Sequence, residues 1–173
     1  LPWDRAYPGL RRTFQVTRLF PQLTVVENVI APLRKFRWRH LIADAVSGPE
    51  AERAAELLEF VGMAEFAHQP AWQLSFGQQK LVELAQVLML EPRLVLLDEP
   101  AGGVNPGLIE RIAELIRALN RNGLTFLIVE HNMPVVLELC DPILVMARGR
   151  VIAEGDPKRI QSDPAVLDAY LGQ

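Results

Sequence analysis

Two apolar runs in the second half of the chain constrain the fold more than any other feature. "RLVLLDE" covers residues 93–99 and "LTFLIVEH" covers residues 124–131. Neither run alternates strictly between apolar and polar residues, which is typical of strands covered on both faces of a sheet. The segment between them, 106–121, has apolar residues at helical spacing, and Pro106 suits its first turn. A strand, a helix and a second strand in this order predict a parallel sheet in an α/β protein.

The first half of the chain is predicted to be mostly helical. Residues 50–61 form an amphipathic pattern that Gly62 ends, with one apolar stripe made by Ala54, Leu57, Leu58 and Val61. Thr24 and Glu27 have the spacing of a capping box. Ser75 is placed to cap a helix that runs through Leu90.

Beyond residue 131 the pattern predicts smaller elements. A short helix is expected over 133–140, then two strands joined by a turn at Arg148–Gly149, and a closing helix over 163–172. Within the helix 106–121, the inward residues are expected to be Ile109, Ile112, Ala113, Ile116 and Leu119.

Composition limits the classes of function. The 173 residues are half hydrophobic, enough for one compact domain with a core. A net charge of -3 gives no broad electrostatic footprint for nucleic acid. The basic run at 33–40 is interpreted as a solvated face, with a docking surface for a partner or a lipid headgroup as the alternative. The lone Cys140 is expected to be a buried structural thiol in a reducing compartment.

Asp98 and Glu99 end the first apolar run. The carboxyl ends of parallel strands are where α/β folds place ligands. One acid there can hold a hydrated magnesium ion through its waters. The next side chain points the opposite way along the strand, so it is free to act on an attacking water as a general base. The alternative is a pair of solvated acids at a strand end.

Two further features suggest anion binding. Ser75, Gly77 and Gln78 stand at a predicted helix N-terminus, where free backbone N–H groups favour phosphate oxygens; an ordinary capped helix is the alternative. His131 follows the second strand and is placed to hydrogen-bond a terminal phosphate, unless it is a satisfied loop histidine. Gln15 could reach a metal or a water, or be surface polar, and the residue alone does not decide.

The order of these motifs is more specific than any one of them. It resembles that of the ATP-binding-cassette ATPases over essentially the whole chain. The resemblance implies an α/β, P-loop NTPase-like ABC ATPase core with an incomplete parallel sheet and an α-helical subdomain. One partial ATPase domain is expected over 1–173, with the helical and signature subdomain at about 21–92 and the Walker B side of the core at about 93–173.

The resemblance also implies a role for each motif. "LSFGQQK" matches the family signature, "LVLLDEP" the Walker B strand and "AGGVNP" the D-loop. By this match, Glu99 and His131 are expected to be catalytic residues, and Asp98 and Gln15 are expected to bind magnesium. The nucleotide-binding residues are expected to be Gln15, Ser75, Phe76, Gly77, Gln78 and Asn105. Two departures stand out: Phe76 replaces the first glycine of LSGGQ, and Asn105 stands where aspartate is common.

Several stretches resemble the ATPase subunits of branched-chain amino acid importers, including "RTFQVTRLFPQLTVVENV" and the ending "DPAVLDAYLG". This implies ATP and Mg²⁺ as cofactors, membrane permease subunits and a second, head-to-tail ATPase subunit as partners, and no nucleic acid. The helical half, including 24–66, would dock the permease. The expected location is the cytoplasm, peripheral on the inner face of the plasma membrane. An ATPase of the same family that works outside transport is a further alternative.

No segment matches the phosphate-binding pattern G-x-x-x-x-G-K-[ST], because none of Lys35, Lys80 and Lys158 follows a glycine. In the family this loop precedes the Q-loop glutamine, which is Gln15 here. The chain therefore resembles the later part of an ATPase domain, and we expect it not to bind ATP tightly alone and to expose apolar sheet edges. The alternative is a degenerate, non-catalytic cassette that pairs with or regulates an intact ATPase.

Overall fold

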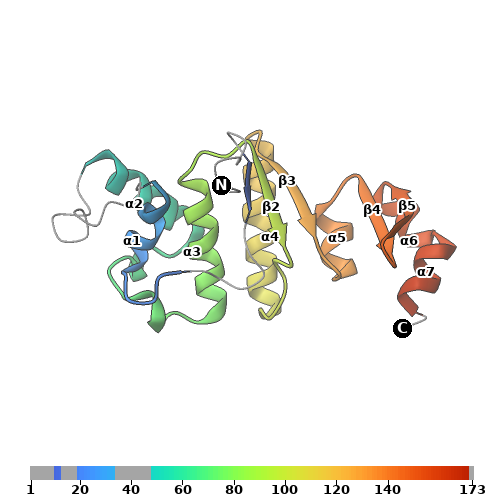
Figure 1. Cartoon of the computed structure of the whole chain (residues 1–173), viewed down its shortest axis with the longest axis horizontal. Coiled ribbons are helices and arrows are strands. Elements are labelled where there is room, and N and C mark those ends of the chain that lie inside the picture. Colours follow the sequence, from blue (N-terminus) through green and yellow to red (C-terminus); the bar gives the residue numbers. More distant parts are fainter. Residues whose placement is uncertain (1–9, 13–18, 34–47, 172–173) are drawn as a thin grey trace. The chain divides into compact units, whose positions relative to one another are not determined.

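The computed structural model describes residues 10–12, 19–33 and 48–171 (Figure 1). The chain forms two compact units, residues 1–129 and residues 130–173. Each unit is described by itself. Gln15 and most of the basic run 33–40 lie outside the described residues.

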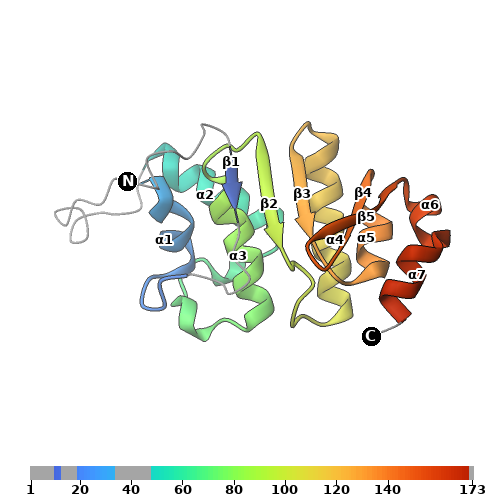
Figure 2. The same ribbon diagram turned by 45° about the vertical axis from the view of Figure 1, so that its right-hand side comes forward.

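The first unit contains a parallel sheet, as the sequence predicts. Its strands are β1 (Leu10–Arg12), β2 (Leu94–Asp98) and β3 (Thr125–Val129), in the order β1-β2-β3. The register pairs Leu94 with Thr125 and Asp98 with Val129, so β2 and β3 end side by side. Helix α4 (Pro106–Arg121) connects β2 to β3 and lies along the sheet (Figure 2). The carboxyl end of β2 is therefore placed beside that of β3, at one edge of the sheet.

The two apolar strands differ in how far they are covered. In β2, Val95 and Leu97 are buried. In β3, Leu127 is 53% exposed and Val129 is 58% exposed. The prediction that both strands are covered on both faces is therefore wrong for β3. The described residues cover only one face of β3. The composition of a strand cannot show which neighbouring elements are present to bury that strand.

Three helices form the rest of the first unit: α1 (Val25–Ile30), α2 (Pro49–Val61) and α3 (Phe76–Leu88). They pack against one another. Short 3₁₀ segments connect them at Ala31–Leu33, Ala64–Phe66 and Ala71–Gln73. The buried residues of α2 are the predicted ones: Ala54, Leu57, Leu58 and Val61. Gly62 ends α2 in the left-handed conformation, at φ 79°.

Asn28 lies in α1, and its side chain bonds back to the turn that precedes the helix. Its side chain is fully buried. Its amide group donates to the carbonyls of Phe20, Leu23 and Thr24 at 3.1, 3.3 and 3.0 Å, and its Oδ1 accepts from the Phe20 N–H at 2.7 Å. The capping box between Thr24 and Glu27 is present as predicted. One buried amide therefore organises the whole of the turn 20–24.

Two details of the helices differ from the sequence prediction. Helix α3 ends at Leu88 rather than Leu90. The next bonds, Leu90 N to Val87 O and Glu91 N to Leu88 O, span three residues and tighten the turn, and Glu91 then adopts φ 48°. In α4 the residues Ile112, Ala113 and Ile116 are buried as predicted. Ile109 and Leu119 are only partly buried, whereas Leu115, which the pattern missed, is buried.

The second unit follows the predicted order with one addition. It contains α5 (Met133–Leu139), the antiparallel pair β4 (Ile143–Ala147) and β5 (Arg150–Gly155), α6 (Pro157–Ser162) and α7 (Pro164–Leu171). The turn at Arg148–Gly149 has φ 49° and 75°, as a two-residue hairpin requires. Helix α6 was not predicted, although Asp156 caps it and Pro157 opens it. Its Ile160 is fully buried in the core of this unit, with Val136, Ile143 and Val166.

Cys140 follows α5 and packs against that core. It is partly buried rather than fully buried, and it is a free thiol. Burial, and to a lesser extent the nearby Glu130 carboxylate, raise the pKa of the thiol. Within the described residues, no helix is long and apolar enough to cross a bilayer.

Candidate functional site

The signature residues begin helix α3. Ser75 and Gln78 form a capping box: the Gln78 N–H donates to Ser75 Oγ at 3.3 Å, and the Ser75 N–H donates to Gln78 Oε1 at 2.9 Å. Each side chain thereby holds the other at the exposed start of the helix. Phe76 is 41% exposed at the same place. The first turn therefore presents a polar, pre-ordered helix N-terminus, a setting that favours anionic oxygens.

Gly77 lies on the side of this turn that faces α4. A Cβ atom built on Gly77 would overlap the Leu108 side chain. The sequence predicts that a glycine here lets the backbone approach a ligand. In the structure the neighbour is Leu108 of the same unit, so the close approach joins α3 to α4, and a role toward a ligand stays a prediction.

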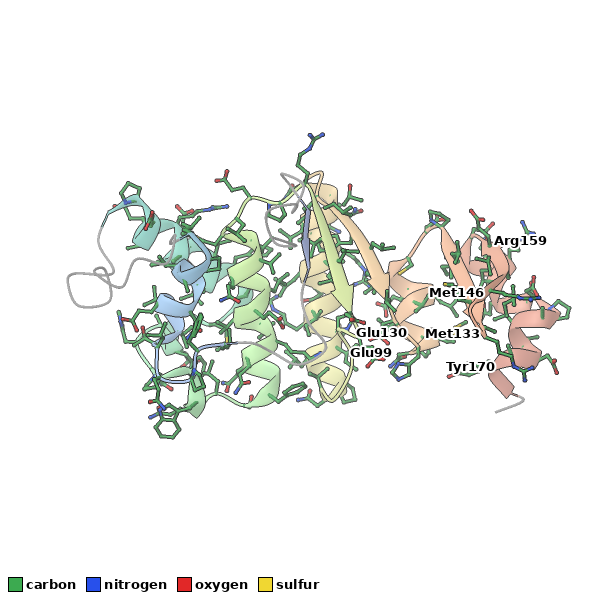
Figure 3. All side chains as sticks on the ribbon, in the orientation of Figure 1. Glu99, Glu130, Met133, Met146, Arg159 and Tyr170 are labelled. Atoms are coloured by element: carbon green, nitrogen blue, oxygen red, sulfur yellow. The ribbon has the colours of Figure 1, made fainter. Side chains whose placement is uncertain are left out.

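Asp98 and Glu99 stand where β2 ends, as predicted. Figure 3 labels Glu99 at this end of the strand. The Glu99 N–H continues the pairing with β3 by donating to the Val129 carbonyl at 2.9 Å. Glu99 then adopts φ 48°, in the left-handed region that side chains other than glycine rarely occupy. The chain leaves the sheet at this residue, and both carboxylates are only partly buried.

The segment after Glu99 is a tight turn that leads to α4. The Gly102 N–H donates to the Glu99 carbonyl at 3.0 Å, and Gly103 adopts φ 71°. The Asn105 side chain caps α4 by accepting from the Leu108 N–H at 3.0 Å. An uncharged amide can therefore fulfil the capping role at the position where aspartate is common.

His131 belongs to the second unit. Its imidazole is 77% exposed, and its Nδ1 lies 3.9 Å from Glu130 Oε2. The Glu130 carboxylate is 1% exposed and accepts from the N–H groups of His131 and Asn132 at 2.9 and 3.0 Å. Asn132 in turn caps α5. Glu130 thus orders the turn that presents His131, a role that the sequence analysis missed although the acid directly precedes the histidine.

The donor set limits how a metal ion could bind. Within the described residues, no group of three or more His, Cys, Asp or Glu side chains is arranged to hold one. Magnesium ions often bind through one or two carboxylates together with water and substrate phosphates. Asp98 therefore fits a magnesium ion that arrives with a nucleotide, rather than a cage built from protein ligands alone.

One hollow among the described residues of the first unit lies elsewhere. It is lined by residues at the start of β2 and β3, including Arg93 and Thr125, and by Arg53 and Leu57 of α2. Asp98 and Glu99 are at the opposite ends of these strands. We place the candidate site at the carboxyl ends, because the polar groups and the backbone turns gather there.

Comparison with known families gives an independent result. A family described as "ABC transporter" matches residues 4–102, more than half of the chain. The chain belongs to the ABC transporter family. A second family, "Branched-chain amino acid ATP-binding cassette transporter", matches residues 150–173 of this ABC transporter chain. These matches confirm the resemblance seen in the sequence.

Curated ABC transporter proteins similar to this chain have consistent names. The high-affinity branched-chain amino acid transport ATP-binding protein BraF of Pseudomonas aeruginosa is 37% identical over an alignment of 177 positions, which includes 97% of this chain and 69% of BraF. LivG of Escherichia coli K12, named as the same kind of protein, is 36% identical over an alignment of 174 positions, which includes 95% of this chain and 68% of LivG.

Solved structures confirm the fold. A crystal structure of the ADP conformation of MJ1267, an ATP-binding cassette of an ABC transporter, superposes with a TM-score of 0.80 at 35% identity. The match covers 95% of this chain and 69% of that one. CbiO1 of Clostridium perfringens, part of the ABC transporter complex cbiONQ, gives 0.75 at 28% identity, over 95% and 65% of the two chains. The α/β class of the ABC ATPase core is thereby established for this chain.

Proposed function

We propose that this chain provides the later motifs of an ATPase subunit that powers the import of branched-chain amino acids. The placement of Asp98 and Glu99 at the carboxyl end of β2 carries the proposal, in a chain whose relatives BraF and LivG are named for that transport. The match of residues 150–173 to the branched-chain amino acid cassette family supports the same substrate class.

Membership of the family implies ATP binding, and the residue roles are part of the proposal. Mg-ATP, when bound, supplies the phosphoanhydride bond and the charge-neutralising cation. The proposed nucleotide-binding residues are Gln15, Ser75, Phe76, Gly77, Gln78 and Asn105. Asp98 and Gln15 would hold the metal ion.

Two residues have proposed roles in the chemistry. The Glu99 carboxylate accepts a proton from the attacking water at one of its Oε atoms. The exposed imidazole of His131 donates a hydrogen bond to a terminal phosphate oxygen. The Glu130 carboxylate supports this by fixing the backbone on both sides of the imidazole, through the His131 and Asn132 N–H groups.

The proposed partners are membrane permease subunits and a second ATPase subunit in head-to-tail arrangement. In this arrangement the chain is cytoplasmic and lies on the inner face of the membrane. The helices α1 to α3 and their connections are the proposed docking side. Because no segment of the 173 residues has the phosphate-loop pattern, we expect the chain alone to be inactive.

The experiment compares the 173-residue chain with the same chain fused after a phosphate-loop segment from an ABC transporter ATPase. Calorimetric titration with Mg-ATP is expected to give no saturable heat for the chain alone and saturable binding for the fusion. The fusion should hydrolyse ATP and, with permease partners in vesicles, drive leucine uptake. Glu99→Gln in the fusion should keep binding and lose hydrolysis.

Two results would contradict the proposal. Tight Mg-ATP binding by the chain alone would show that residues outside the proposed set hold the phosphates. A folded fusion that binds Mg-ATP but hydrolyses none would favour the degenerate, non-catalytic cassette that pairs with an intact ATPase.

A further inference from the structure

The backbone of Glu99 is held in an uncommon conformation by several hydrogen bonds. Its φ of 48° belongs to the left-handed region. Its N–H donates to the Val129 carbonyl at 2.9 Å, which fixes one side of the residue to β3. Its carbonyl accepts from the Gly102 N–H at 3.0 Å and from Lys80 Nζ at 2.9 Å. The direction in which the Glu99 side chain leaves the backbone is thus set by its neighbours.

Lys80 comes from a different element, the second turn of α3, 19 residues earlier in the chain. Its ammonium group also lies over the Phe76 ring, 5.3 Å from the ring centroid, at a distance typical of a cation–π contact. A hydrogen bond from a charged donor is roughly twice as strong as a neutral one. The Lys80 contact therefore makes a substantial contribution to holding the Glu99 carbonyl.

The Phe76 ring contacts the other end of the same turn. A Cβ atom built on Gly103 would stand 3.1 Å from Phe76 Cε1. The first two turns of α3 thus meet the segment 99–103 twice, through Lys80 at Glu99 and through Phe76 at Gly103. Phe76 also follows directly on Ser75, the residue that caps α3.

We propose that Lys80 is a positioning residue for Glu99. Its ammonium group holds the Glu99 carbonyl, maintains the left-handed backbone and so aims the carboxylate. Lys80 and Phe76 together couple the start of α3 to the turn at Glu99, so a displacement of Ser75–Gln78 also displaces that turn. This inference rests on the proposed function for the significance of Glu99, while the contact itself is independent of it.

The test uses the complete 173-residue chain and needs no nucleotide. Hydrogen exchange of the Gly102 amide reports on the turn, because that amide donates to the Glu99 carbonyl. Lys80→Met is expected to raise its exchange rate about tenfold, since one charged donor to the shared carbonyl is lost. Lys80→Arg should restore the protection. Lys158→Met, which removes an exposed lysine in α6 of the second unit, is the matched control and should leave the rate unchanged.

Unchanged protection of Gly102 in a folded Lys80→Met chain would overturn the inference. Denaturant unfolding verifies that the variant folds; if it does not, Lys80→Gln replaces it and is judged by the same criterion. In the phosphate-loop fusion, Lys80→Met should lower kcat for ATP hydrolysis about tenfold with KM nearly unchanged, and Lys80→Arg should recover it.

The two proposals fail separately. Suppose that the fusion hydrolyses no ATP and that the Gly102 amide still loses protection in Lys80→Met. The proposed function is then overturned, and the Lys80 contact is supported. Hydrolysis by the fusion, with Gly102 protection unaffected by Lys80→Met, overturns the inference alone.

Discussion

The ring of Phe76 packs directly against Gly103, which adopts φ 71°. Residue 103 is therefore restricted twice, because a side chain there would meet both an unfavourable backbone conformation and the ring. The common signature has glycine at position 76 and could not make this contact. The aromatic residue at position 76 and the glycine at position 103 thus form one packing unit.

Gly103→Ala is expected to lower the free energy of unfolding by about 2 kcal/mol, from left-handed backbone strain and crowding against Phe76. Gly123→Ala is the matched control: Gly123 has φ 91° and no neighbour near an added Cβ atom, so only the strain applies, about 1 kcal/mol. Denaturant unfolding measures both. The double variant Phe76→Ala/Gly103→Ala should lose less stability than the sum of the losses in the two single variants. Strictly additive losses would show that the ring does not restrict residue 103.

Asn28→Ala is expected to destabilise the first unit by about 3 kcal/mol, because it leaves the Phe20 N–H and three carbonyls without their buried partner. The control is Asn120→Ala, which removes a single exposed bond to the Leu124 carbonyl and should cost less than about 1 kcal/mol. Thermal unfolding of the two variants measures the difference. Equal losses of stability in the two variants would mean that the buried hydrogen bonds of Asn28 contribute little to the stability of the fold.

Ser75→Ala removes half of the capping box at the start of α3 and should cost about 1 kcal/mol. Ser162→Ala removes a hydroxyl that bonds only to carbonyls at the exposed end of α6, and should cost less than about 0.5 kcal/mol. Circular dichroism during urea unfolding measures each. Similar midpoints for the two variants would contradict a capping role for Ser75.

The raised pKa of Cys140 predicts a pH dependence. Because burial disfavours the thiolate, the folded chain holds the proton more tightly than the unfolded chain. Its contribution to stability is therefore fully present below the unfolded pKa, about 8.5, and is lost as the pH rises through the folded value. Between about pH 7 and pH 10, the free energy of unfolding should fall more in the wild type than in Cys140→Ser. Parallel curves would contradict the prediction.

Local signals in the sequence predicted local structure well. The capping boxes at Thr24 and Ser75 and the apolar stripe of 50–61 depend on residues within a turn or two, so spacing alone reveals them. The order of the motifs likewise identified the family correctly. Helix α6 was missed despite its cap because only Ile160 anchors it in the core.

Features that depend on distant residues could not be predicted. The contact of Lys80 with the Glu99 carbonyl joins two elements across 19 residues, and nothing in either local pattern indicates it. The exposure of Leu127 depends on what lies against β3, not on β3 itself. The placement of Gln15 and the subdomain boundary near residue 92 remain predictions.

The left-handed backbone of Glu99 has a consequence for how such sites are recognised. Within the described residues, the residues other than glycine that have a positive φ are Glu91, Glu99 and Arg148. Arg148 belongs to a hairpin turn, and Glu91 to the turn that follows a helix. At Glu99 a strand ends, and glycine would relax the main chain while removing the carboxylate. A strained backbone position is a reason to ask what its side chain does, and at Glu99 the strain agrees with the role in chemistry proposed for the carboxylate.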